Sequence, residues 1–198
     1  MPKLPDTIIL ASRSPRRAQL LRQIGVAFET SVCDIDELFD PAMSPVENAR
    51  ALSYMKAADV ASRYRRGIVL GSDTIVVLDG MLLGKPVSEE DARRMLRTLS
   101  GRTHTVVTGF ALVDAESKKS YIDCEQTDVT FRSLDDDEIA AYVAAGSPMD
   151  KAGAYGIQDD FGAVFVERIA GDYYTVVGLP LSKVYCALQQ FMTLLQKG

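Results

Sequence analysis

Short apolar runs alternate along the chain with amphipathic stretches of helical period, which predicts strands and helices in turn. Residues 8–11 form an apolar strand that leads directly into a helix over residues 15–24. That helix places Ala18, Leu21 and Ile24 on one face and ends at a glycine, which suits a left-handed C-terminal cap. The first element pair is therefore a strand followed closely by a helix.

The next helix opens at Ser44, whose spacing to Glu47 is that of a capping box. We expect it to extend to about Arg65 and to bury Leu52, Met55 and Val60. The other predicted elements are a strand over 28–33, a strand at Ile68–Leu78 with a hairpin turn at Asp79 and Gly80, a helix over 88–100, strands within 103–132, a helix over 135–145, a strand pair over 163–169 and 173–177, and a closing helix over 181–195. The mixture of strand–helix units and hairpins, without repeats or linkers, predicts one α/β domain over residues 1–198 on a mixed sheet.

The composition of the chain argues against a nonspecific nucleic-acid-binding protein and a membrane protein. The chain has 198 residues, is 47% hydrophobic and carries a net charge of −5, so a polyanion would need a local basic site. The bulk charge therefore argues against a nonspecific nucleic-acid binder. No segment has the pattern of a signal peptide or a membrane span, which predicts a reduced, cytoplasmic protein without a membrane partner.

Cysteine and histidine give no sign of a zinc site. Cys33, Cys124 and Cys186 are far apart, and His104 is the one histidine of the chain. Because His104 falls on a predicted strand with no second histidine or cysteine near it in sequence, we interpret it as structural.

The start of the first helix has the features of a phosphate site. Ser14 is a suitable N-cap and Pro15 suits the first helical position, so the free N–H groups of the first turn face outward. The positive charges of Arg16 and Arg17 are unfavourable at this positive end of the helix dipole. Phosphate recognition by their guanidinium groups would explain why arginines occur there. The alternative is that these arginines, with Arg13, are ordinary solvated side chains.

Asp73 is the best catalytic candidate, because a carboxylate inside an apolar strand is costly to bury unless it is paired, metal-bound or at an opening. A structural aspartate bonded to a nearby turn is the alternative. Asp36 and Glu37 lie in an acidic loop whose oxygen atoms suit Mg²⁺ or Mn²⁺ together with substrate phosphates. Such a loop on its own is more often only solvated.

Two lysines and one loop complete the candidates. Lys56 lies within the second helix and Lys85 in a Gly-Lys-Pro turn, and either is also compatible with a surface position. Residues 150–158 contain three small flexible positions that let backbone approach a ligand, and Gln158 offers a donor and an acceptor to a base edge. The chain has no P-loop motif and no serine-hydrolase elbow.

Taken together, six collinear motifs resemble the Maf family of nucleoside triphosphate pyrophosphatases over nearly the whole chain. The motifs are Leu10-Ala11-Ser12 with Ser14-Pro15-Arg16-Arg17, Gly71-Ser72-Asp73-Thr74, Gly84-Lys85-Pro86, Leu99-Ser100-Gly101, residues 149–158, and Val177-Gly178-Leu179-Pro180. The resemblance implies a mixed elongated sheet flanked by helices, two lobes with a cleft between them, and a homodimer. It also implies hydrolysis of a nucleoside triphosphate to the monophosphate and pyrophosphate with a divalent metal cation.

The resemblance assigns roles to individual residues. Asp73 corresponds to the proposed proton acceptor, and Glu37 falls where an acidic residue helps at the metal or the water. Substrate phosphates would be held at four positions: Ser12, Arg17, Lys56 and Lys85. Cations and metal would neutralise the charge that develops on the bridging oxygen while the carboxylate deprotonates a water.

Three positions suggest the substrate base. Arg16, Thr74 and Gln158 look like the branch that acts on dTTP and UTP, and we expect modified pyrimidine nucleotides to be accepted as well. A neutral amide pairs with the edge of uracil or thymine, whereas a carboxylate prefers guanine. After Gln158 the chain departs from the family pattern at Asp159 and Asp160, whose charges would weaken nucleotide affinity, alter base choice or recruit metal.

The alternative from another class is a nucleotide-binding regulator of septum formation or cell division with little catalysis. Nucleic-acid binding through the arginine-rich helix start is a weaker hypothesis, because the net charge is negative and no basic pattern interleaved with aromatic residues is present.

Overall fold

The computed structural model describes residues 4–5, 7–146, 148–158 and 161–197. The strands are β1 (Ile8–Leu10), β2 (Phe28–Thr30), β3 (Ile68–Leu78), β4 (Met81–Leu83), β5 (Thr103–Asp114), β6 (Ser120–Phe131) and β7 (Val166–Ala170). The α-helices are α1 (Pro15–Gln23), α2 (Pro45–Ala61), α3 (Glu89–Leu99), α4 (Asp136–Ala144), α5 (Tyr173–Val177) and α6 (Leu181–Gln196). Two 3₁₀ helices, η1 (Ala152–Ala154) and η2 (Phe161–Phe165), complete the set for these residues.

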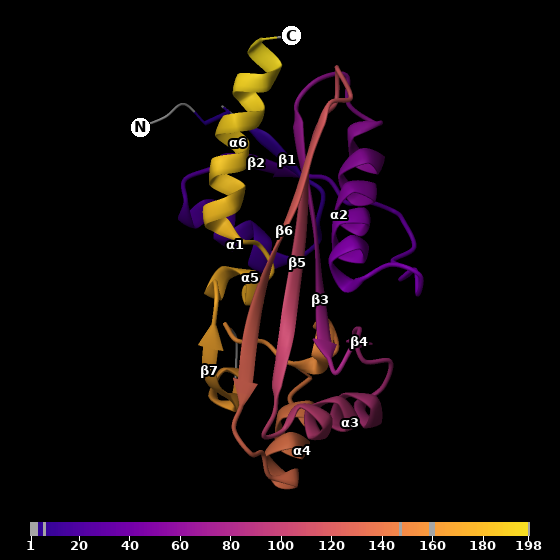
Figure 1. Cartoon of the computed structure of the whole chain (residues 1–198), viewed down its shortest axis with the longest axis vertical. Helices are drawn as coiled ribbons and strands as arrows, with labels where there is room; N and C mark the ends of the chain where they lie inside the picture. Colours follow the sequence, from indigo (N-terminus) through magenta and orange to yellow (C-terminus); the bar gives the residue numbers. More distant parts are fainter. Residues whose placement is uncertain (1–3, 6, 147, 159–160, 198) are drawn as a thin grey trace. The chain divides into compact units, whose positions relative to one another are not determined.

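Within the described residues, seven strands form one sheet in the order β2-β1-β3-β5-β6-β7, and β4 pairs with β3 beside this path (Figure 1). The sheet is mixed, since β1 runs parallel to both β2 and β3, whereas β4 is antiparallel to β3 and β7 is antiparallel to β6. The predicted α/β class with a mixed sheet flanked by helices is confirmed.

The chain divides into two compact units. Unit 1 comprises residues 1–73, 108–125 and 178–198, and unit 2 comprises residues 74–107 and 126–177. Strands β3, β5 and β6 each contribute residues to both units. The single domain and the cleft between lobes expected from the sequence stay predictions.

Unit 1 packs helices directly on the strands, with α2 and α6 on either side of them (Figure 1). Its core includes small residues where α2 meets the sheet: Ala57, Ala61, Ala111 and Ala115. A Cβ atom added at Gly71 would lie only 2.3 Å from the Ser53 carbonyl oxygen of α2. Glycine at this position of β3 therefore permits the close approach of the helix backbone.

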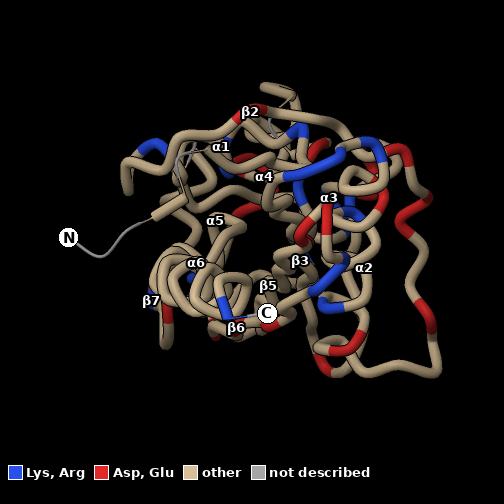
Figure 2. Tube along the Cα trace, turned by 90° about the horizontal axis from the view of Figure 1, so that it is seen from above, with Lys and Arg blue, Asp and Glu red and all other residues tan. Residues whose placement is uncertain are grey.

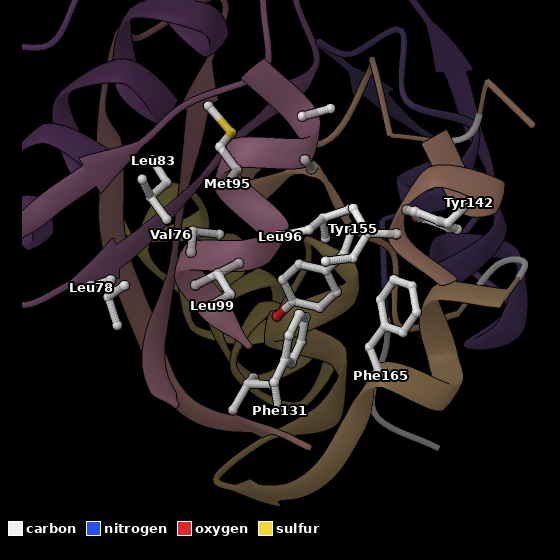
Figure 3. Packing of buried hydrophobic residues seen from close by; sticks show 14 of the residues in the cluster. Val76, Leu78, Leu83, Met95, Leu96, Leu99, Phe131, Tyr142, Tyr155 and Phe165 are labelled. Carbon is white, nitrogen blue, oxygen red and sulfur yellow. The ribbon is translucent and has the colours of Figure 1, made fainter. Parts of the chain in front are cut away.

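Unit 2 has an aromatic core. Figure 3 shows Phe131, Tyr155 and Phe165 close to one another, and the rings of Phe131 and Tyr155 meet edge to face at 4.7 Å between centroids. His104 is buried here, and its Nε2 lies 2.8 Å from the hydroxyl oxygen of Tyr155. Burial lowers the pKa of His104 to about 4, while Asp128 raises it slightly. These contacts fit the structural role that we assigned to His104.

Several local signals formed as expected. The Ser44 hydroxyl accepts the Glu47 backbone N–H, and the Glu47 carboxylate accepts the Ser44 N–H, which completes the capping box of α2. Asp79 and Gly80 have positive φ angles of 49° and 78°, as a type I′ hairpin turn requires. Side chains that serve as caps and turns act over a few residues, so their geometry follows from local sequence.

Three boundaries differ from expectation. Strand β2 ends at Thr30, three residues before the expected Cys33, and α2 ends at Ala61, before the expected Arg65. Residues 163–165, expected in a strand, belong to η2 instead. Ser14 is the N-cap of α1 by position, but its side chain makes no cap bond. Its backbone N–H donates to the Ser12 hydroxyl.

The expected strand over residues 173–177 was wrong. These residues form helix α5. The Asp172 carboxylate accepts hydrogen bonds from the N–H and the hydroxyl of Thr175, both at 2.7 Å, which caps the first turn. This local capping overrides the strand preference of the Tyr and Val residues in the segment.

Figure 2 shows Lys and Arg interspersed with Asp and Glu along the trace. Among the described residues, no helix is long and apolar enough to cross a membrane.

Candidate functional site

The loop between β1 and α1 brings Ser12 and Arg17 together in unit 1. The Ser12 hydroxyl oxygen accepts two hydrogen bonds, one from the Ser14 N–H at 3.1 Å and one from Nη1 of Arg17 at 3.2 Å. Strand β1 ends at Leu10, so this loop leaves the sheet beside Ser72 and Asp73, where β3 continues. The start of α1, Arg17 and Ser12 therefore lie together beside β3. The phosphate site expected here stays a prediction.

A buried ion pair joins α2 to β3 in unit 1. Lys56 Nζ lies 2.5 Å from Oδ1 of Asp73 and 2.7 Å from Oε1 of Glu37. The side chains of Lys56 and Asp73 are only 5% and 9% exposed, whereas that of Glu37 is 41% exposed. Asp73 is thus neutralised by a lysine of α2, and the acidic loop reaches the same ammonium group from the solvent side.

Hydrophobic periodicity did not predict that Lys56 is buried. Met55, expected in the core, is 47% exposed, and Lys56 points inward in its place. Leu52 and Val60 are buried as expected, so Met55 is the one position of the predicted face that was wrong. Lys56 can be buried there because it pairs with two carboxylates. The surface alternative for Lys56 is therefore wrong.

Arg17 is electrostatically linked to this pair. Burial lowers the pKa of the Arg17 guanidinium, and the charges of Asp73 and Glu37 raise it in partial compensation. Arg16 lowers the same pKa by like-charge repulsion. Burial also raises the pKa of the Cys33 thiol, which Lys56 opposes. The structure thus gathers four predicted residues around Asp73 in unit 1: Ser12, Arg17, Glu37 and Lys56.

The structure adds two groups to the site that the sequence reasoning did not assign. The carbonyl oxygen of Gly178 accepts a hydrogen bond from Nε of Arg17 at 2.8 Å. The same oxygen lies 3.2 Å from the hydroxyl oxygen of Ser72. Ser72 is fully buried. Both residues belong to motifs that carry the family resemblance, so the sequence pointed to these segments. It could not point to the carbonyl itself, because every residue has one.

The remaining candidates belong to unit 2, apart from Arg16 on α1 in unit 1. Thr74 follows Asp73 on β3 and points to the opposite face of the strand. Lys85 is exposed, and the carbonyl of the neighbouring Gly84 accepts the N–H of Gly153 at 3.0 Å. This bond joins the Lys85 turn to η1, in the loop that leads to Gln158.

Gln158 is half-buried, and the adjacent Gly153 and Ala154, earlier in its loop, both have positive φ angles, of 70° and 61°. Asp159 and Asp160, which we expected to affect the site, lie outside the described residues.

The candidate metal donors of the site are the carboxylates of Asp73 and Glu37. Across the described part of the chain, no group of three or more His, Cys, Asp or Glu side chains is placed to hold a metal ion. Asp73 and Glu37 nevertheless both lie within 2.7 Å of one cationic atom, so the two carboxylates already share a positive charge. One or two carboxylates completed by substrate phosphates and water are the usual donor set for Mg²⁺. The residues present therefore fit a metal that arrives with a phosphorylated ligand.

The arrangement combines groups that phosphoanhydride chemistry needs. A carboxylate such as Asp73 has the chemistry of a proton acceptor, while Arg17 and Lys56 bring positive charge to its neighbourhood. Positive charge beside a carboxylate of low exposure suits an anionic substrate that must be attacked by water.

Comparison with known proteins agrees with this chemistry. The sequence model of a family described as "Maf-like protein" matches residues 7–191. A protein of Alkaliphilus metalliredigens named dTTP/UTP pyrophosphatase is 49% identical over 180 residues, which cover 90% of this chain and 93% of that protein. A protein of Salinibacter ruber with the same name is 48% identical over 187 residues, covering 94% and 92%.

Among solved structures, the chain is similar to a HAM1 protein from Coxiella burnetii, with 19% identity, a TM-score of 0.48 and coverage of 97% of this chain and 99% of that one. This likeness is too low to carry an argument.

Proposed function

Because this chain belongs to the Maf family, we propose that it is a nucleoside triphosphate pyrophosphatase acting on dTTP and UTP. The reaction adds water across the anhydride between the α and β phosphates and releases the nucleoside monophosphate and pyrophosphate. The observation that supports this most is the buried Asp73 carboxylate, which pairs with Lys56 and whose charge partly offsets the lowering of the Arg17 pKa by burial.

In this proposal Asp73 takes the proton from the attacking water. Lys56 compensates the charge of Asp73 before substrate binds, and its ammonium group also attracts phosphate oxygens. Ser12 and Arg17 hold phosphate at the start of α1, where outward N–H groups favour an anion. Lys85 is the fourth residue that we propose to bind substrate phosphate.

Asp73 and Glu37 are the residues that would hold a Mg²⁺ or Mn²⁺ ion. When bound, the metal would neutralise negative charge on phosphate oxygens. Arg16, Thr74 and Gln158 select the base, and the amide of Gln158 pairs with the polar edge of uracil or thymine. The homodimer and the cytoplasmic location rest on the sequence alone and stay predictions.

A substrate panel tests the proposal directly. The protein is incubated with dTTP, UTP, CTP, GTP and 7-methyl-GTP in the presence of Mg²⁺ or Mn²⁺, and the products are separated. We expect dTTP and UTP to give the monophosphate and pyrophosphate. Release of orthophosphate, or no turnover of any pyrimidine triphosphate, would contradict it. Tight nucleotide binding without product would favour the regulatory alternative.

The variant Asp73→Asn tests the role of the carboxylate. We expect it to abolish turnover while nucleotide binding stays measurable by calorimetry, because the amide keeps the shape and removes the base. Asp128→Asn is a matched control, since Asp128 is an exposed carboxylate on β6 that accepts a hydrogen bond from the Thr105 hydroxyl at 2.7 Å. Loss of folding in Asp73→Asn, seen as a lost thermal transition, would instead support a structural Asp73.

A further inference from the structure

A single backbone carbonyl links two parts of the site in unit 1. The Gly178 oxygen accepts Nε of Arg17 at 2.8 Å and lies 3.2 Å from the Ser72 hydroxyl. The same hydroxyl lies 2.8 Å from the carbonyl oxygen of Gly109 on β5. Both neighbours are carbonyl acceptors, so Ser72 shares its single hydroxyl proton between a sheet strand and the segment that holds the guanidinium group.

The backbone around Gly178 fixes the position of its carbonyl oxygen. Gly178 has a φ of 119°, a conformation that L side chains rarely adopt, and it directly precedes the fully buried Leu179. Pro180 then forms the N-cap of α6. The carbonyl is thus anchored by a core side chain and by the start of a helix on one side, and by Ser72 on the other.

The bond from Nε matters because of the shape of a guanidinium group. Nε and the two terminal nitrogens lie in one plane, so fixing Nε on Gly178 and Nη1 on Ser12 sets the plane and direction of the whole group. A group that is oriented in advance loses less rotamer freedom when it binds its ligand.

We propose that Ser72 is a positioning residue for Arg17: through the Gly178 carbonyl it holds the guanidinium in the orientation that binds the triphosphate of the substrate. This inference rests on the proposed function for the identity of the ligand. Side chains alternate along β3, so Ser72 faces away from Asp73 and does not touch the Lys56–Asp73 pair. Its effect therefore belongs to phosphate binding and not to proton transfer.

The test measures binding of inorganic triphosphate by calorimetry without divalent metal, which isolates the protein's own cations. We expect Ser72→Ala to weaken this binding about three- to tenfold, the effect of one lost hydrogen bond. In hydrolysis of dTTP the same variant should raise KM and leave kcat within about twofold. Ser72→Cys, which is slightly larger and keeps a weaker donor, should fall between Ser72→Ala and the native protein.

A double-mutant cycle separates positioning from a general structural role. In the Arg17→Lys background, which lacks the Nε donor, Ser72→Ala should change triphosphate affinity by less than about twofold. Ser53→Ala is the matched control, because Ser53 is an equally buried serine whose hydroxyl binds the Ala49 carbonyl within its own helix. It should leave triphosphate affinity unchanged, whatever it does to thermal stability.

Equal effects of Ser72→Ala in both backgrounds, unchanged affinity in Ser72→Ala, or no triphosphate binding by the native protein would each overturn the inference. The outcome is separable from that of the proposed function. A protein that shows the expected coupling but does not hydrolyse dTTP refutes the proposed function alone. A protein that hydrolyses dTTP but shows additive effects refutes the positioning role alone.

Discussion

The residue that most shapes the site is Lys56, a lysine with only 5% of its side chain exposed. Burying an ammonium group is costly unless a carboxylate compensates it, and Asp73 does so at 2.5 Å within the same buried environment. Glu37 contributes less, because it is 41% exposed and solvent screens its charge. A pair of this kind is weak evidence for stability, since an apolar pair of similar volume often serves as well. Its presence is better explained by chemistry than by folding.

His104 provides a prediction about pH, because burial lowers its pKa from 6.5 to about 4. Between these two pH values the unfolded chain binds more protons than the folded one, so the free energy of unfolding falls as the pH falls from 6.5 to 4. The loss contributed by His104 should reach about 3 kcal/mol below pH 4. Urea unfolding followed at pH 7, 6, 5 and 4 measures it.

The control for this prediction is His104→Gln, whose amide can still bond to the Tyr155 hydroxyl. Acidic groups such as Glu138, whose pKa lies at about 2 because Arg132 pairs with it, affect both proteins alike. The variant should therefore lose less stability than the native protein between pH 7 and pH 4. An identical pH dependence in the two proteins would show that His104 does not titrate in the way its burial implies.

At the scale of elements, the contact of α2 with β3 decides whether Lys56 reaches Asp73. A Cβ at Gly71 would lie 2.3 Å from the Ser53 oxygen and 2.7 Å from the Ala57 nitrogen, both backbone atoms of α2. We expect Gly71→Ala to push the helix away, to destabilise the protein by about 2–4 kcal/mol and to reduce dTTP turnover at least tenfold. Urea unfolding and a kinetic assay measure the two effects.

Gly146→Ala is the companion variant. A Cβ there meets nothing within 4 Å, so only its φ of 79° is unfavourable, which costs about 1 kcal/mol. It should lose some stability and keep its turnover. Turnover in Gly71→Ala equal to that in Gly146→Ala would mean that the site tolerates displacement of α2.

Elements set by local signals were predictable from the sequence, and those set by long-range contacts were not. The capping box at Ser44 and the turn at Asp79 depend on neighbours within a few residues. The burial of Lys56 depends on Asp73 and Glu37, which are distant in sequence. Hydrophobic periodicity instead predicted that the neighbouring Met55 is buried. Helix α5 could have been inferred from Asp172 and Thr175, had the cap been weighed against the strand preference of the segment.

The same distinction applies to the site. Side chains with a charge or a strong donor, such as Arg17 and Asp73, stand out in a sequence because their chemistry is unusual where they occur. The role we propose for Ser72 passes through the Gly178 carbonyl, which every residue has, and only the fold places it against Arg17.

At the scale of the whole molecule, neither compact unit is a continuous segment of chain. The backbone passes from one unit to the other after residues 73, 107, 125 and 177, and three of these passages occur within or next to β3, β5 and β6. Each of these strands therefore begins in one unit and ends in the other. Loss of strand structure in one unit releases the ends of the strands that the other unit needs, which favours unfolding as one cooperative domain.

This argument predicts that a core substitution in either unit shifts one common transition. Leu52→Ala in α2 of unit 1 and Leu96→Ala in α3 of unit 2 each remove a buried leucine side chain and should each cost about 2–5 kcal/mol. Urea unfolding followed by circular dichroism should stay a single transition with a lower midpoint, and amide hydrogen exchange should accelerate in the protected strands of both units. If Leu96→Ala instead produced two transitions, with early loss of protection confined to unit 2, the units would be separate domains, because the strands they share would then not couple their stabilities.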